Sequence, residues 1–146
     1  MKKILVPIDG SSVSEKTVEK AVEIAKMYGS SITFVHIVNV PDTYRFSRHV
    51  GYMELNIKSM TDNMKKNGQE MLESVVGNID CNKLDCEKIV VVGQPEEEIL
   101  RFASDGNFDL IIMGRRGYSK IKRFFVGSVT QRVISDSTCP VLVVNE

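Results

Sequence analysis

Short apolar runs alternate with amphipathic segments along the whole chain, and this alternation limits the possible folds more than any other feature. The runs are residues 3–8, 32–38, 87–92, 110–113 and 141–144. Their continuous hydrophobic character is typical of strands that are buried on both faces. Strands that alternate with helices form a parallel sheet with helices on both faces. We therefore expect residues 1–146 to form one α/β domain with a doubly wound, five-stranded parallel sheet.

Local signals mark where several of the helices begin and end. Ser12 and Glu15 have the spacing of a capping box, which predicts the start of the first helix, and Gly29 fits its end. Apolar residues at helical spacing then predict a long helix over residues 53–75, with a methionine stripe that we interpret as core packing. Gly68 weakens the middle of this helix by about 1 kcal/mol relative to alanine. Later helices are predicted to begin at Pro95 and at Ser128.

Residues 39–52 form a connection that is unusually long for a compact domain. This segment could fold over a ligand, or it could be an excursion without a role. The residues themselves favour neither interpretation.

Composition restricts the environment and the partners of the chain. The 19 basic and 19 acidic residues cancel, but five of the basic residues lie between Gly114 and Gly127, where no acidic residue occurs. A neutral chain with one basic loop indicates a small anionic ligand rather than a nucleic acid. Three cysteines without paired spacing, no signal peptide and no long apolar run predict a cytoplasmic protein that spans no membrane.

The stretch from residue 110 to residue 128 carries the strongest chemical signal. A buried strand ends at Gly114, a second glycine follows at Gly117, and Gly127 and Ser128 open the next helix. Glycine can adopt positive φ or let another group approach the backbone closely, and a helix N-terminus offers N–H groups to phosphate. The pattern predicts a polyphosphate site. A solvated basic loop is the alternative.

These residues resemble the universal stress protein family, in its nucleotide-binding form. The spacing Gly-x₂-Gly-x₉-Gly-Ser is carried by Gly114, Gly117, Gly127 and Ser128. The opening Lys-Ile-Leu-Val-Pro-Ile-Asp-Gly-Ser at residues 3–11 is similar to the family's start. So are Val-His-Ile at the end of the second strand, Val-Val-Gly after the third, and Pro-Val-Leu-Val-Val at the end.

The resemblance implies strand order 3-2-1-4-5, in which the loops after the first and fourth strands face one crevice. It also implies ATP as the ligand, alone or with Mg²⁺ or Mn²⁺. Asp9 would contact the ribose or a metal, and the backbone of Ile37 would face the adenine. The predicted binding residues are Pro7, Asp9, Ile37, Met113, Gly114, Gly117, Gly127, Ser128 and Val129. No catalytic residue is implied, so any hydrolysis of ATP would be slow.

The last strand would lie at the edge of this sheet, where an apolar strand invites pairing with another chain. The family commonly dimerises in this way, so we expect a homodimer through residues 141–144. A dimeric interaction scaffold of the same fold that ignores nucleotide is the alternative function.

Several residues keep two interpretations. Either Arg115 or Arg116 could pair with phosphate, although we expect at least one of them to face solvent. Asp9 could be a turn residue only, and Ser11 and Ser12 are expected to be helix caps. His36 is expected to pack in the sheet. P-loop, dinucleotide-binding, receiver-domain and hydrolase motifs are not found, and a zinc site is not expected.

Overall fold

The computed structural model describes residues 1–39, 51–77, 79, 84–117 and 126–145, with the backbone alone for residues 51–57. The strands are β1 (Lys3–Pro7), β2 (Ser31–Val38), β3 (Cys86–Val92), β4 (Leu110–Gly114) and β5 (Val141–Val144). The helices are α1 (Ser14–Tyr28), α3 (Gly51–Val76), α4 (Pro95–Asp105) and α5 (Ser128–Asp136). Each of the predicted strands and helices is present. Most of the long connection predicted at 39–52 lies outside the described residues.

The strands form one parallel sheet in the order β3-β2-β1-β4-β5, which confirms the predicted fold class and strand order. β1 lies in the centre, where Leu5 is paired with Thr33 of β2 and with Ile111 of β4. The chain moves outward in one direction through β2 and β3, and then in the other through β4 and β5. The loops after β1 and β4 therefore diverge at the carboxyl end of the sheet and leave a crevice between them.

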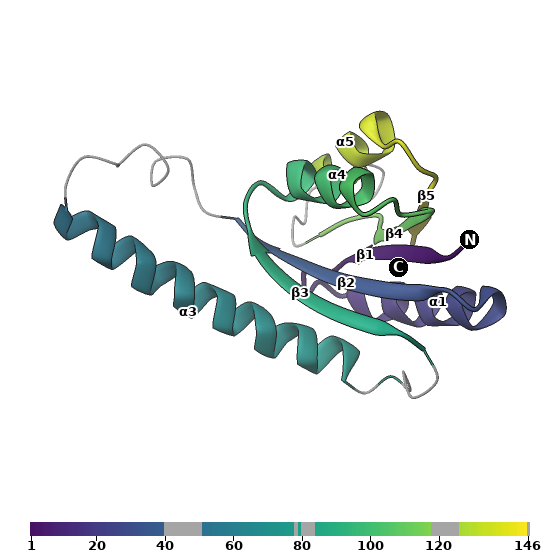
Figure 1. Ribbon diagram of the computed structural model, residues 1–146, viewed down its shortest axis with the longest axis horizontal. Helices are drawn as coiled ribbons and strands as arrows, with labels where there is room; N and C mark the ends of the chain where they lie inside the picture. The colour runs from purple at the N-terminus through teal and green to yellow at the C-terminus, as the bar shows by residue number, and fades with distance from the viewer. Residues whose placement is uncertain (40–50, 78, 80–83, 118–125, 146) are drawn as a thin grey trace.

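Helices cover both faces of the sheet, so two hydrophobic cores form (Figure 1). One core lies under α1 and α3 and includes Val6, Phe34 and Leu72. The other lies under α4 and α5 and includes Leu5, Ile99 and Val133. Successive residues of β1 serve opposite cores because side chains alternate between the faces of a sheet. This explains why β1 has no polar position among its buried residues.

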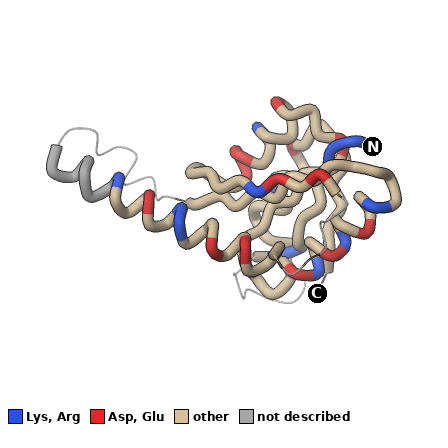
Figure 2. Tube along the Cα trace, turned by 60° about the horizontal axis from the view of Figure 1, so that its bottom comes forward, with Lys and Arg blue, Asp and Glu red and all other residues tan. Residues whose placement is uncertain are grey.

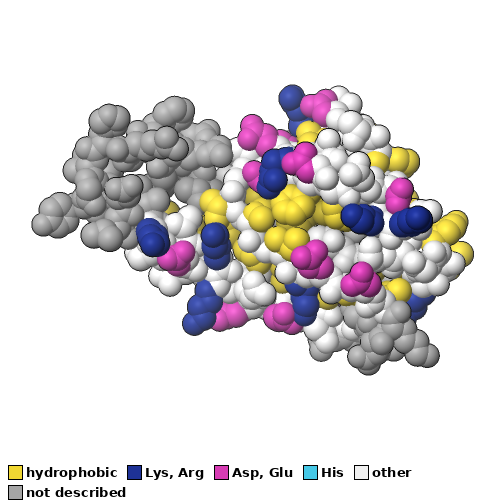
Figure 3. All heavy atoms as spheres, in the orientation of Figure 1, with side chains coloured by type: hydrophobic (Ala, Val, Ile, Leu, Met, Phe, Trp, Pro, Cys, Tyr) yellow, Lys and Arg dark blue, Asp and Glu magenta, His cyan; other side chains and the backbone are white. Residues whose placement is uncertain are grey.

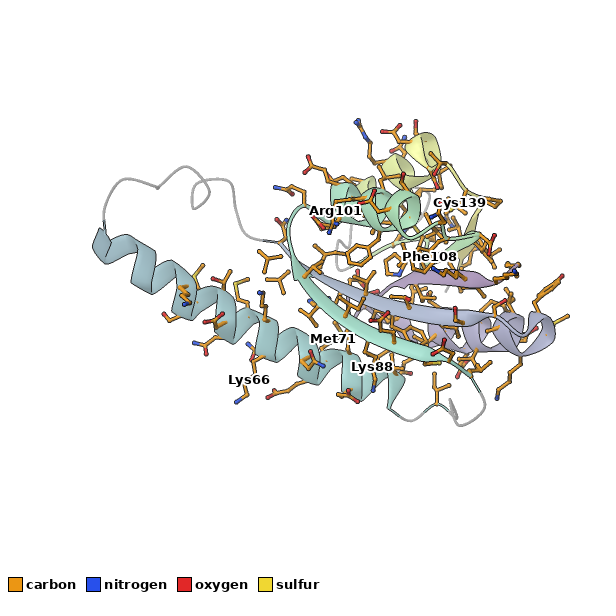
Figure 4. All side chains as sticks on the ribbon, viewed as in Figure 1. Lys66, Met71, Lys88, Arg101, Phe108 and Cys139 are labelled. Carbon is orange, nitrogen blue, oxygen red and sulfur yellow. The ribbon has the colours of Figure 1, made fainter. Side chains whose placement is uncertain are left out.

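The long helix α3 uses its methionine side as predicted. Met71 and Val75 pack against the first core, and Leu72 is fully buried beside them. Figure 4 shows Met71 on the side of α3 that faces the sheet and Lys66 on the opposite side. Figure 2 shows basic and acidic residues mixed along the outer sides of the helices. Figure 3 shows the same mixture around a group of hydrophobic side chains near β3 and α4.

The predicted capping box at Ser12 and Glu15 is wrong. Helix α1 begins at Ser14, its N-cap residue is Val13 in the αR conformation, and no side chain caps it. The chain already turns before the helix, because the Ser14 N–H donates to the Ser11 carbonyl over 3.0 Å. The end of α1 agrees with expectation: Gly29 adopts φ 61°, ψ 39°, and its N–H donates to the Ala25 carbonyl.

Candidate functional site

A cavity of about 410 Å³ opens at the carboxyl ends of β1 and β4, where the order of the sheet reverses. Open α/β sheets bind ligands at this place. Each of the nine residues predicted for the nucleotide site lines the cavity. They are Pro7, Asp9, Ile37, Met113, Gly114, Gly117, Gly127, Ser128 and Val129. The sheet thus brings together residues from four separate segments, in agreement with the crevice predicted from the strand order.

Asp9 is both a turn residue and part of the cavity wall. Its Oδ1 accepts the N–H of Ser11 at 2.9 Å and the hydroxyl of Ser14 at 3.1 Å. The Ser14 Oγ in turn accepts the N–H of Gly10 at 3.1 Å. Gly10, which adopts φ 81°, and the buried Ser14 are thereby held in the same turn. One carboxylate oxygen is therefore held by the turn, while the other faces Gly117.

The glycines of the loop allow close approach rather than unusual backbone angles. A Cβ atom on Gly117 would lie 2.3 Å from Oδ2 of Asp9, far inside van der Waals contact. On Gly114 it would lie 3.3 Å from both the Arg116 carbonyl and Val13 Cγ1. Gly127 adopts φ −61°, ψ 150°, which any residue tolerates, and a Cβ there would meet protein atoms only at 3.5 Å. Glycine could be required at position 127 for a positive φ or for close approach to the backbone. The first reason is wrong, because the φ at this position is one that any residue adopts.

The first three residues of α5, Ser128, Val129 and Thr130, line the cavity. The N–H of Gln131 donates to the Gly127 carbonyl over 2.8 Å, which is the first bond of the helix. The N–H groups of Ser128 and Val129 precede that bond and have no acceptor within the helix. The resemblance to the family would place the N–H groups of Gly127 to Val129 on phosphate. The Gly127 N–H instead donates to the Arg115 carbonyl over 2.9 Å, so this part of the expectation is wrong. The Thr130 hydroxyl donates to the Gly114 carbonyl at 3.0 Å and joins the helix start to β4.

The two arginines of the loop differ in position. Arg116 is half-buried and lines the cavity, whereas Arg115 is not among its lining residues. The backbone of Arg115 instead joins the loop to its surroundings, because its N–H donates to the Val144 carbonyl over 2.8 Å. The other basic residues of the loop, Lys120, Lys122 and Arg123, lie outside the described residues.

Sequence reasoning missed about half of the cavity wall. The additional lining residues are Ile8, Ser11, Ser14, Thr17, Asn39, Pro95, Ile99, Arg116 and Thr130. Ser11 and Pro95 were expected only as a helix cap and a helix start, whereas Arg116 was already considered as a partner of phosphate. Thr17 gives no sequence signal, because it lies inside the helical pattern of α1 and reaches the cavity only through the fold. Ser12, considered only as a cap, does not line the cavity.

The cavity has an apolar part and a polar part. Ile37, Pro95 and Ile99 provide an apolar wall beside the end of β2, and Asp9, Gly117 and Ser128 provide polar groups beside α5. Within the described part of the chain, no three His, Cys, Asp or Glu side chains are grouped to hold a metal ion. The arrangement suits a ligand with a flat apolar part and an anionic part.

The fold and the cavity define this protein as a doubly wound α/β domain with a ligand crevice at the reversal of its sheet. The chain matches the universal stress protein family over residues 1–145, and it belongs to that family. The universal stress protein YxiE of Bacillus subtilis is 35% identical over 144 residues, which cover 97% of each chain. Among the described residues, no helix is long and apolar enough to cross a bilayer.

Solved structures support the same fold. The structure of protein MJ0577, a universal stress protein of Methanocaldococcus jannaschii, has a TM-score of 0.77 at 28% identity and matches 99% of this chain and 96% of its own. A universal stress protein in complex with cAMP has a TM-score of 0.61 at 22% identity, with 99% and 96% covered. One from Archaeoglobus fulgidus in complex with dAMP has a TM-score of 0.58 at 20% identity, with 98% and 97% covered.

Proposed function

We propose that this chain is a cytoplasmic ATP-binding universal stress protein that acts as a nucleotide-dependent switch within a single domain. The observation that carries the proposal is that Asp9, the three glycines and the first residues of α5 line one cavity. Two family members of the same fold are described as complexes with cAMP and dAMP, so adenine nucleotides suit this architecture.

The phosphates of the nucleotide bind at the start of α5. The N–H groups of Ser128 and Val129 and the Ser128 hydroxyl donate to phosphate oxygens, and the positive end of the helix dipole favours their charge. Gly127 lets the phosphates approach the backbone, because a Cβ atom there would meet protein atoms only at 3.5 Å, and Gly114 and Gly117 line the cavity beside it. Arg116 adds a cation from the cavity wall.

The nucleoside binds at the apolar wall. The adenine lies beside Ile37, whose backbone faces its edge, while Pro7 and Met113 line the ribose region. Asp9 contacts the ribose or a Mg²⁺ or Mn²⁺ ion through Oδ2, since Oδ1 is already held by the turn. Among the described residues that line the cavity there is no histidine or glutamate, and Asp9 is tied into its turn, so any hydrolysis is slow.

Calorimetric titration with ATP and Mg²⁺ or Mn²⁺ tests the proposal directly. We expect a micromolar Kd, and ATP at 100 times that value should stabilise the folded chain by about 2.7 kcal/mol through mass action. Mass spectrometry of the small molecules released from denatured protein would identify a nucleotide carried through purification. No heat and no thermal shift at millimolar ATP would favour the scaffold function instead.

The edge strand β5 supports a homodimer, with or without nucleotide. It lies at the end of the sheet order, and Leu142 on this strand is 36% exposed. An unpaired apolar edge can pair with the same strand of a second chain about a two-fold axis. Sedimentation should give a dimer at tens of micromolar, and truncation after Pro140 should give monomers or insoluble protein. A wild-type monomer at that concentration would exclude this interface.

A further inference from the structure

The ladder between β1 and β2 ends beside the cavity in an unusual way. Pro7 is paired with Val35, and the next residue, Ile8, still donates its N–H to the Val35 carbonyl over 2.9 Å. In a parallel ladder the Ile8 carbonyl would next accept the N–H of Ile37. The structure has no such bond between these two described residues. Instead, the Ile8 carbonyl lies 2.8 Å from Nδ1 of His36, so a side chain of β2 occupies the acceptor.

The direction of this hydrogen bond follows from its partners. A carbonyl oxygen only accepts, so Nδ1 of His36 must carry the proton. Both the neutral ring with its proton on Nδ1 and the charged ring satisfy this requirement. The contact therefore holds in either protonation state of His36.

The backbone of Ile37 is left facing the cavity. Backbone groups of successive strand residues point alternately to the two neighbouring strands. The Val35 carbonyl points to β1, where it accepts the Ile8 N–H, and the Val38 carbonyl points to β3, where it accepts the Gly93 N–H at 3.1 Å. Ile37, two residues after Val35, therefore directs its N–H and its carbonyl to the β1 side. β1 has ended there, and Ile37 lines the cavity.

Gly68 of α3 makes room for the histidine ring. A Cβ atom at this position would lie 2.6 Å from Cδ2 and 3.3 Å from Nε2 of His36, and 3.2 Å from Val90. Glycine is unfavourable in the middle of a helix, and yet the buried side of α3 has one here. The helix thus supports the ring from the side opposite to its hydrogen bond with Ile8.

We infer that His36, seated against Gly68, is a positioning residue that ends the β1–β2 ladder and keeps the backbone of Ile37 available to an adenine base. The inference rests on the proposed function, and it adds a physical reason why the backbone of Ile37 is not paired with β1. Adenine presents one acceptor and one donor amine on an edge, which match one N–H and one carbonyl. Without His36, the Ile8 carbonyl can accept the Ile37 N–H, and the base loses a donor.

Titration with ATP and with inorganic tripolyphosphate separates the base from the phosphates. We expect His36→Leu to raise the Kd for ATP about tenfold, the value of one hydrogen bond, and to leave the Kd for tripolyphosphate unchanged. His36→Asn retains an amide donor near the place of Nδ1, so its Kd for ATP should stay within about threefold of wild type.

A second variant changes the residue of α3 that lies against the His36 ring. Gly68→Ala changes no residue that lines the cavity, but its methyl group must displace the His36 ring. It should show the same selective loss of ATP affinity as His36→Leu. Asn67→Ala, at an exposed neighbouring position of α3, is the matched control and should bind both ligands as wild type does.

The possible outcomes distinguish this inference from the proposed function. Wild-type protein that binds no ATP overturns both. Wild-type protein that binds ATP, together with a folded His36→Leu that binds it equally well, overturns the inference alone. Equal weakening of ATP and tripolyphosphate would also overturn it, because a general loosening of the sheet predicts that result. Circular dichroism of each variant establishes that it is folded.

Discussion

At Gly117, the space that a side chain would need is already filled. A Cβ atom there would lie 2.3 Å from Oδ2 of Asp9. The carboxylate cannot simply turn away, because its Oδ1 is bound by the Ser11 N–H and the Ser14 hydroxyl. Glycine at this residue is therefore required by a contact between two loops that are more than a hundred residues apart in the chain. The spacing of the glycines indicated close approach by a ligand. At Gly117 the structure shows that the close neighbour is Asp9 of the same chain.

We expect Gly117→Ala to weaken ATP binding by about tenfold or more, because displacing Asp9 costs at least one of its charge-assisted hydrogen bonds. Calorimetric titration measures the change. Gly29→Ala is the control, since Gly29 lies at the far end of α1 and should affect stability without affecting ATP affinity. Unchanged ATP affinity in a folded Gly117→Ala variant would mean that Asp9 and Gly117 do not need to be in contact for binding.

At the scale of elements, α1 shows what sequence patterns can and cannot predict. Its apolar spacing and its final glycine predicted the helix and its end correctly. Its start was misjudged because Ser12 and Glu15 matched a local motif, whereas Ser14 is engaged with Asp9 through the turn. The same reason explains the missed part of the cavity: Thr17 and Asn39 become its walls only when β1, β2 and β4 come together. Strand order was predicted because the resemblance to the family supplied it.

The end of α1 gives a prediction for this element. Gly29 adopts φ 61°, and a Cβ atom there would contact nothing within 4 Å. Gly29→Ala should therefore lower the free energy of unfolding by about 1 kcal/mol, through backbone strain alone. Urea unfolding measures the loss. Gly29→Asn should lose less, since asparagine tolerates the left-handed conformation better, and an equal loss in both variants would contradict this explanation.

For the whole molecule, one carboxylate joins the start of β1 to the segment before β4 at the amino end of the sheet. Asp109, just before β4, accepts the N–H of Lys2 at 2.6 Å and the N–H of Lys3 at 3.0 Å. These two backbone hydrogen bonds lower the pKa of Asp109 below its ordinary value of 3.8. The Lys3 ammonium adds a bond of 3.1 Å to the Gly106 carbonyl. The start of β1 is thereby fixed to the strand beside it, at the end of the sheet opposite to the cavity.

This arrangement predicts how acid affects stability. The folded chain has the lower pKa at Asp109, so the stabilisation is complete above about pH 5 and is lost as the pH falls through 3.8 and then through the folded pKa. Asp109→Asn should be less stable than wild type at pH 7, because a neutral amide oxygen accepts the two N–H groups more weakly. The difference should be smaller at pH 3, below the ordinary pKa of 3.8, because acid removes the stabilisation that the charged carboxylate provides. Urea unfolding of both proteins at the two pH values measures it, and a difference that stays constant between them would show that the charge of Asp109 does not contribute.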